Sequence, residues 1–180
     1  QLVCWDGSQV CDLIDCPVEP HFVVEIEETG ESTLFIFQDT ITSLDINDQL
    51  GLFDYEGIVD SDGSIGEILI GTGIWDGTQL SIAAISSVDL SQFGGPILPG
   101  SVSGNSLALK IWDDSEQTEF DATYEINTGS GTFNGLFTAI SEVTPIICDF
   151  DYDSDSICDD EDSDDDNDGV NDDVDFCPLS

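Results

Sequence analysis

The most regular chemistry-bearing residues are aspartates near the C-terminus, in two segments that align with a shift of 13 residues. Each segment has Asp at positions 1, 3, 5, 9 and 12. In this spacing, side-chain oxygens at alternating positions wrap a hard cation and the position-7 carbonyl adds a ligand. The predicted ligands of the first loop are Asp151, Asp153, Asp155, Ile157, Asp159 and Asp162, and those of the second are Asp164, Asp166, Asp168, Val170, Asp172 and Asp175. We therefore predict two or more bound Ca²⁺ ions, because an all-protein oxygen cage suits calcium better than magnesium.

The two loops differ at position 6, where the chain must turn sharply. Gly169 stands there in the second loop and Ser156 in the first, which makes the first site the less secure. Position 12 is Asp where an EF-hand has Glu, and no flanking helices are apparent. The loops are therefore not EF-hands.

A longer pattern covers the end of the chain. Residues 164–178 read D-x-D-x-D-G-x-x-D-x-x-D-x-C-P. Residues 148–178 thus resemble thrombospondin type 3 calcium-binding repeats. The resemblance implies a chain poor in helix and sheet, wound around a row of calcium ions and pinned by disulfides. By analogy, it also implies that Cys158 pairs with Cys177.

The acidic charge is concentrated in the same region. Residues 148–180 hold 15 of the 40 acidic groups, and few apolar side chains. Ordering these 33 residues costs roughly 50 kcal/mol at about 1.5 kcal/mol each, and self-repulsion adds to that cost. We therefore expect folding to be coupled to metal binding. A halophilic acidic coat and a disordered tail are the alternatives, and neither accounts for the even spacing.

The overall charge excludes several functions. The chain has a net charge of −39, with one Lys, no Arg and one His. No surface here can neutralise phosphates, so nucleic-acid binding is excluded, as is docking onto an anionic membrane. No apolar run is long enough for membrane insertion. The expected partners are cations, neutral surfaces or copies of the chain itself.

Six cysteines form two clusters, for which disulfides in an oxidising compartment are the best interpretation. The disulfide candidates are Cys4, Cys11 and Cys16 at the front, and Cys148, Cys158 and Cys177 at the back. Three cysteines cannot all pair within one cluster. If all are oxidised, at least one bridge joins front to back, within one chain or between two copies; a free thiol is the alternative. A first residue Gln1 is expected of a mature chain whose leader has been removed, so we predict a secreted protein at the cell surface or outside the cell.

The middle of the chain has the pattern of an all-β protein. Short runs rich in β-branched and aromatic residues alternate with glycine-rich turns, and no helical stripe is visible. We predict an antiparallel β-sandwich. The expected strands are 22–28, 33–37, 43–46, 49–53, 67–71, 79–85, 106–112, 119–126 and 135–143.

Three motifs add a resemblance for this stretch. They are SLDINDQLGLFD at 43–54, GIWD at 73–76 and LKIWD at 109–113. Residues 20–145 thus resemble immunoglobulin-like repeats of secreted surface proteins of Bacteroidota-type bacteria, which implies a building block without catalytic activity. The expected organisation is a Cys-rich, disulfide-bonded segment at 1–19, an immunoglobulin-like β-sandwich at 20–146 and an irregular calcium-wound tail at 147–180.

The sequence contains few residues that suggest catalysis or sugar binding. His21 is interpreted as a strand-edge residue and Lys110 as a solvent-facing strand residue, and no nucleophile or phosphate-loop motif is present. Carboxylates are too numerous for counting to exclude a glycosidase pair. Trp5, Trp75 and Trp112 could form a sugar platform, although the last two fit a core better. We expect no enzyme.

Two tripeptides resemble O-glycan acceptors of the same bacterial group. These are Asp-Thr-Ile at Thr40 and Asp-Ser-Ile at Ser156, and we name both as candidate glycosylation sites.

Together these features predict an extracellular, calcium-stabilised structural protein, the repeating subunit of a head-to-tail surface filament. The alternative is an adhesin or glycan-binding module of a larger surface protein, with the calcium tail as a rigid spacer. A third interpretation is an accessory segment of a secreted hydrolase.

Overall fold

The computed structural model describes residues 2–12, 16–133, 136–147, 152, 158–159, 162–167, 169–172 and 174. It divides into two compact units, Gln1–Thr144 and Pro145–Ser180. The residues described include no α-helix. The all-β prediction is therefore confirmed.

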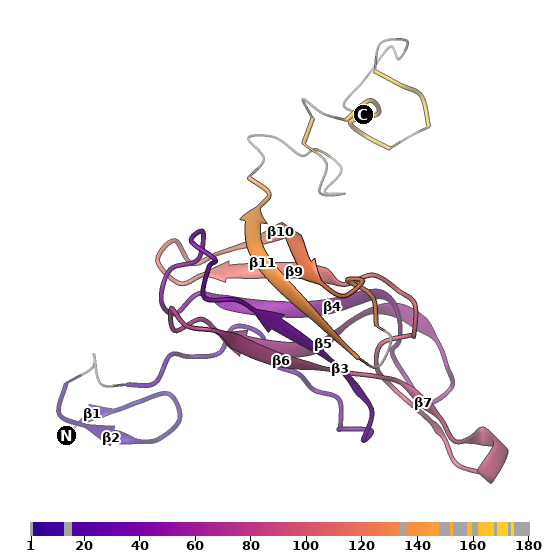
Figure 1. The fold of residues 1–180 in the computed structure, drawn as a ribbon, viewed down its shortest axis with the longest axis horizontal. Coiled ribbons are helices and arrows are strands. Elements are labelled where there is room, and N and C mark those ends of the chain that lie inside the picture. Colours follow the sequence, from indigo (N-terminus) through magenta and orange to yellow (C-terminus); the bar gives the residue numbers. More distant parts are fainter. Residues whose placement is uncertain are drawn as a thin grey trace. The chain divides into compact units, whose positions relative to one another are not determined.

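The first unit is built on one seven-stranded sheet with the order β5-β4-β9-β10-β11-β3-β6 (Figure 1). Its strands are β3 (Ser32–Phe37), β4 (Gln49–Ile58), β5 (Ile65–Ile74), β6 (Leu80–Ile85), β9 (Ala108–Asp113), β10 (Thr118–Thr128) and β11 (Phe137–Pro145). Short ladders complete the first unit: β1 (Leu2–Val3) with β2 (Gln9–Val10), and β7 (Val88–Asp89) with β8 (Ile97–Leu98). Pairing is mainly antiparallel, with β11 and β3 parallel.

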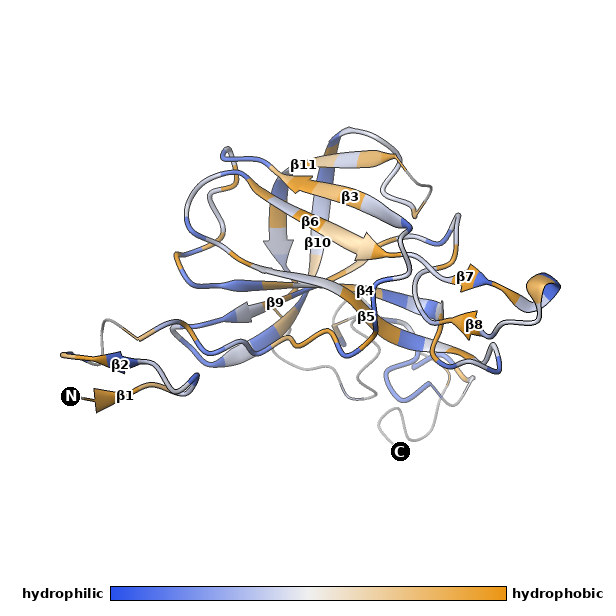
Figure 2. Ribbon diagram, turned by 90° about the horizontal axis from the view of Figure 1, so that it is seen from below, coloured by the Kyte–Doolittle hydropathy of each residue, from blue (hydrophilic) through white to orange (hydrophobic). Residues whose placement is uncertain are grey.

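The sheet curls until its two end strands approach each other, so that it is nearly a barrel (Figure 2). Gly71 of β5 makes this approach possible, because a Cβ there would lie 3.0 Å from Cγ2 of Ile82 and 3.1 Å from the carbonyl oxygen of Ala83, both in β6. The immunoglobulin-like sandwich is not confirmed, since the seven long strands belong to one continuous sheet.

The inside of the curled sheet is the hydrophobic core. Alternate residues along each strand point inward; in β4, for example, Leu50 and Leu52 are fully buried. In β10, Ala122 and Tyr124 pack against the core. Fully buried aromatic rings include Phe35, which meets Phe133 edge-to-face at 5.7 Å between ring centroids.

Two of the expected strands are wrong. Residues 22–28 form no strand: Phe22 lies against Phe53 of β4, and both edges of β4 are already paired, with β5 and β9. Residues 43–46 also form no strand. Their backbone turns instead, because the Asp45 N–H donates to Oδ2 of Asp48 at 2.8 Å and Asn47 has φ of 83°. The short strands β1, β2, β7 and β8 were not expected.

Candidate functional site

The 13-residue sequence repeat of the tail is also a repeat of hydrogen bonding. The Tyr152 N–H donates to Oδ1 of Asp159 at 2.9 Å, and the Asp165 N–H donates to Oδ1 of Asp172 at 3.1 Å. Each bond joins position 2 of a loop to position 9. Both segments therefore fold back on themselves in the same way.

The second loop turns where the sequence predicts. The Gly169 N–H donates to Oδ2 of Asp164 at 3.0 Å, which draws position 6 toward position 1. Gly169 has φ of 92°, which side chains rarely tolerate, so glycine is required there. One oxygen of the first carboxylate of the loop is thus held by a backbone N–H.

Two carboxylate oxygens of this loop lack a hydrogen-bond donor. Oδ1 of Asp164 and Oδ1 of Asp165 are buried and have no hydrogen-bond partner among the described residues. Burial, together with the negative charges of Asp172, Asp159 and Asp162, raises the pKa of Asp165 to about 6. Carboxylates of both loops therefore lie near enough to Asp165 to act on its charge. A hard cation fits this donor set, which consists of oxygens that nothing else neutralises.

The predicted ligands are only partly described. Asp159, Asp162, Asp164, Asp166, Val170 and Asp172 are described, whereas Asp151, Asp153, Asp155, Ile157, Asp168 and Asp175 lie outside the described residues. Within the described part, no three Asp, Glu, His or Cys side chains converge closely enough to hold a metal ion. Charge repulsion acts over longer distances than a metal–ligand bond. The raised pKa of Asp165 is therefore compatible with carboxylates that do not converge closely enough to bind a metal ion. The calcium sites stay a prediction.

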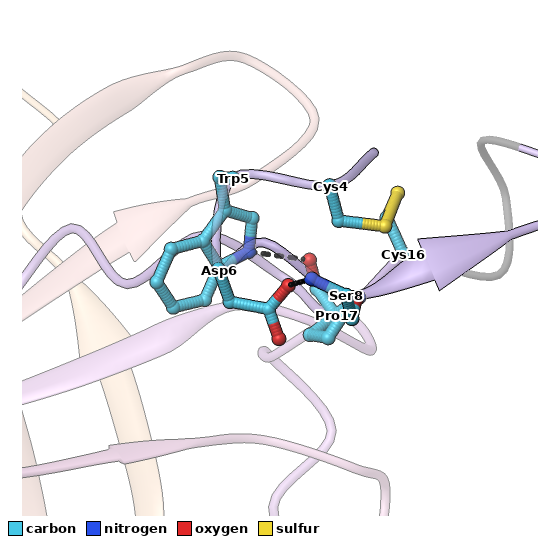
Figure 3. Close-up of a disulfide and its surroundings, with 6 residues drawn as sticks. All are labelled: Cys4, Trp5, Asp6, Ser8, Cys16 and Pro17. Atoms are coloured by element: carbon cyan, nitrogen blue, oxygen red, sulfur yellow. Dashed lines mark hydrogen bonds between the residues drawn. A yellow bond between two sulfur atoms is a disulfide. The ribbon is translucent and has the colours of Figure 1, made fainter. Parts of the chain in front are cut away.

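The front cysteines pair within their own cluster. Cys4 and Cys16 form a disulfide with 5.5 Å between their Cα atoms (Figure 3). The bridge is supported by the Trp5 indole N–H, which donates to the carbonyl of Pro17 at 2.8 Å. Cys11 is free and exposed. One thiol of the front cluster is therefore left over.

The back cysteines are described only at one position. Cys158 is disulfide-bonded. Cys148 and Cys177, its predicted partner, lie outside the described residues.

The outer face of the sheet holds a cluster that the sequence analysis missed. It contains the only two basic side chains of the chain, Lys110 and His21. The Lys110 Nζ lies 3.3 Å from Oε1 of Glu67 and 3.4 Å from Oε1 of Glu119, and 5.1 Å from the ring centroid of Phe53. Burial lowers the pKa of Lys110, but the surrounding carboxylates outweigh it and hold that pKa above its usual value.

His21 binds the other oxygen of the same glutamate. Its Nε2 lies 2.9 Å from Oε2 of Glu119, and its ring stacks on Trp112 with 3.8 Å between ring centroids and an angle of 6° between planes. A cavity of about 290 Å³ adjoins this pair and is also lined by Glu19 and Gln117. The strand-edge interpretation of His21 is wrong, because the residue lies in no strand.

A signal for part of this cluster was present in the sequence. Residues 114–117 form the turn between β9 and β10, and its length sets Trp112 opposite Glu119 and Lys110 opposite Asp121. Cross-strand neighbours on one face interact. No sequence signal places His21 there, because its contacts join residues far apart in the chain.

The remaining candidates are separated from one another. Trp75 is 2% exposed, so its interpretation as a core residue is confirmed. One face of Trp112 is stacked on His21, and Trp5 is half-exposed. The hydroxyl of Thr40 donates to the carbonyl of Ser141 at 2.9 Å from an exposed position. Ser156 lies outside the described residues.

Comparisons with known proteins identify no relative. The chain matches no protein-family model, no curated protein and no solved structure. Within the described residues, no helix has the length and apolar character needed to cross a membrane.

Proposed function

We propose that this chain is an extracellular structural protein whose tail is built by calcium, and that it is the repeating subunit of a head-to-tail surface filament. The observation that carries the calcium part is the pair of buried, unpartnered oxygens on Asp164 and Asp165. They belong to a loop whose backbone repeats the hydrogen bonding of the loop before it. Calcium would be held there by carboxylate and backbone oxygens and would remove the repulsion within the tail.

Secretion and assembly are supported by the cysteines. A disulfide between Cys4 and Cys16 is typical of oxidising compartments. The exposed, free Cys11 remains available for a bridge to a back cysteine of another copy. The curled sheet of the first unit would serve as the rigid building block, in keeping with the resemblance to immunoglobulin-like surface repeats, and it would have no catalytic role.

The experiment is electron microscopy of native material in millimolar calcium and again after EGTA, with a non-reducing gel alongside. We expect filaments that soften or dissociate on chelation. Cys11→Ser is the matched variant, and it should remove any covalent ladder on the gel. Single particles in both conditions, without a ladder, would contradict the filament.

The glycan-binding alternative is less well supported. A platform of three tryptophans needs their rings free, whereas Trp75 is buried and His21 covers one face of Trp112. Trp5 alone is half-exposed. A glycan array with the full chain and with Trp5→Ala would test this alternative if only single particles are seen.

A further inference from the structure

A short segment before the sheet is bound to it by side chains. We call residues 17–22 the strap. The side chain of Gln49, which is fully buried in β4, holds the strap backbone on both sides. Its Oε1 accepts the His21 N–H at 2.8 Å, and its Nε2 donates to the carbonyl of Glu19 at 2.9 Å. Because the buried Gln49 amide both donates to and accepts from the strap backbone, it binds an extended backbone specifically at this position.

The strap also places the ring of Phe22 against residues of the sheet. We call the surface formed by Gln49, Gly51, Phe53, Trp112 and Glu119 the socket. Phe22 is only 5% exposed and meets Phe53 edge-to-face at 5.8 Å between ring centroids. Gly51 makes room for it, because a Cβ at Gly51 would lie 3.0 Å from the Phe22 ring and 2.7 Å from the Phe53 ring. A side chain at position 51 would therefore close the socket.

The strap also contacts a carboxylate of the sheet through a basic side chain. His21 bonds to Glu119, which Lys110 also contacts. The two basic residues of a chain with net charge −39 thus meet at one carboxylate. Two copies of so acidic a chain repel each other, and this contact offers a basic group of one segment to a carboxylate of another.

The strap can leave the sheet without breaking its ladders. Described residues 17–31 belong to no strand, and Val23 just after the strap is 58% exposed. On the other side, β1 and β2 pair with each other and the Cys4–Cys16 bridge closes that segment. Between the strap and Thr29, Ile26 packs against the core, and the Thr29 hydroxyl donates to the carbonyl of Ser86 at 2.6 Å. Once Ile26 leaves the core, residues 23–28 would form the connection between two copies.

We propose that the socket formed by Gln49, Gly51, Phe53, Trp112 and Glu119 receives the strap of a second copy of this chain. Every contact made within one copy is then made between copies, which is the low-cost route of segment exchange. Because each copy would give its strap to the next and receive one from the previous copy, the exchange yields an open chain. This inference rests on the proposed head-to-tail assembly and names its interface.

Two complementary full-length variants test it. Gly51→Val closes the socket and keeps the strap, and the double variant His21→Ala, Phe22→Ala removes the strap contacts and keeps the socket open. Each is checked by circular dichroism and then examined alone and mixed by native mass spectrometry in millimolar calcium. We expect a complex of the two variants only in the mixture. Two variants that keep their sheet and do not associate would overturn the inference.

A second measurement does not depend on the closed-socket variant. A labelled peptide of residues 16–28 is titrated into the full-length Phe22→Ala chain and into the wild type, with a Phe22→Ala peptide as control. We expect the native peptide to bind at least about ten-fold more tightly than the control, a difference of about 1.4 kcal/mol. Equal affinities would overturn the exchange. If wild-type filaments form without strap exchange, the proposed filament stands and this interface is wrong. If exchange occurs without filaments, the interface stands and the proposed filament is wrong.

Discussion

The two units of this chain show two solutions to the same problem, which is how a strongly acidic sequence can hold one conformation. The sheet unit encloses apolar side chains and places most of its acids outside. Its buried carboxylates are satisfied: Asp54 is 1% exposed and accepts the Val102 N–H at 2.8 Å and the Asn105 amide at 2.9 Å. The tail has carboxylate oxygens that are buried without such donors. Stability is therefore expected to come from packing in the first unit and from cations in the second.

The largest effect should follow from breaking the packing. Phe35→Ala removes a fully buried ring from the core, which should lower the free energy of unfolding of the sheet by about 3–5 kcal/mol. Chemical denaturation followed by tryptophan fluorescence measures it. Leu34→Ala, in the same strand and 37% exposed, is the control and should cost about 1 kcal/mol or less. Equal losses for the two variants would contradict the assignment of the core.

Removing the satisfied buried carboxylate should cost somewhat less. Asp54→Ala takes the carboxylate acceptor from the Val102 and Glu56 N–H groups and leaves the Asn105 amide only the Glu56 carbonyl, so we expect a loss of about 2–3 kcal/mol of sheet stability. Calorimetry in calcium and in EGTA should give the same loss, because these donors come from the protein. Asp62→Ala in an exposed turn is the control. A loss that is seen in calcium and disappears in EGTA would mean that Asp54 belongs to a metal site.

In the tail, a single charge should alter calcium binding and leave the sheet untouched. Asp164→Asn removes a carboxylate oxygen that has no hydrogen-bond partner. We expect calcium affinity, measured by isothermal titration calorimetry, to fall at least about ten-fold. Asn171→Ala, at a position outside the ligand pattern, is the matched control. If Asp164→Asn keeps the calcium affinity of the wild type, the second loop does not bind calcium through Asp164.

Proton binding should compete with calcium in the same loop. The pKa of Asp165 is raised to about 6, above the ordinary value for Asp of about 3.9. Without added calcium, the folded tail therefore binds protons more readily than the unfolded tail, and it loses stability as pH rises from about 4 to about 6. Calcium affinity should rise over the same range, because binding displaces the proton.

Calcium titrations at several pH values measure this competition. The Asp165→Asn variant should show a weaker pH dependence than the wild type. A calcium affinity that falls as pH rises through about 6 would contradict this account.

The smallest effect is expected at the surface of the sheet. Lys110→Gln removes the ammonium group that contacts Glu67 and Glu119. These carboxylates are partly exposed, so the loss of sheet stability should be about 1 kcal/mol or less and should shrink in high salt. Thermal melts at low and high salt check this. An effect as large as that of Phe35→Ala would mean that charge rather than packing holds the sheet.

Some of the strands that the sequence predicted correctly have side chains that alternate between core and solvent. Residues 33–37 and 79–85, for example, fall on β3 and β6. Residues 22–28 alternate in the same way and are not a strand, because pairing needs a free neighbouring edge, which a sequence pattern does not contain. The one-sheet architecture escaped prediction for a similar reason, since the close approach of β5 and β6 depends on contacts around Gly71.

The candidate site was predictable where its residues are close in sequence. The Asp164–Gly169 turn follows directly from the spacing, and the structure contains its hydrogen bond. Asp165 was overlooked because it occupies a non-ligand position, and its raised pKa arises from both loops together. The meeting of His21, Trp112 and Glu119 could not be predicted, because it requires the fold of the whole sheet.

The most direct test of the central claim is hydrogen–deuterium exchange of the full chain in millimolar calcium and in EGTA, followed by mass spectrometry of peptides from both units. We predict that peptides from residues 148–180 are protected in calcium and exchange fully in EGTA, while those from β3, β4 and β9 are protected equally in both. Tail peptides that exchange alike in both conditions, or sheet peptides that lose protection together with the tail, would contradict the division into a packed unit and a calcium-built one.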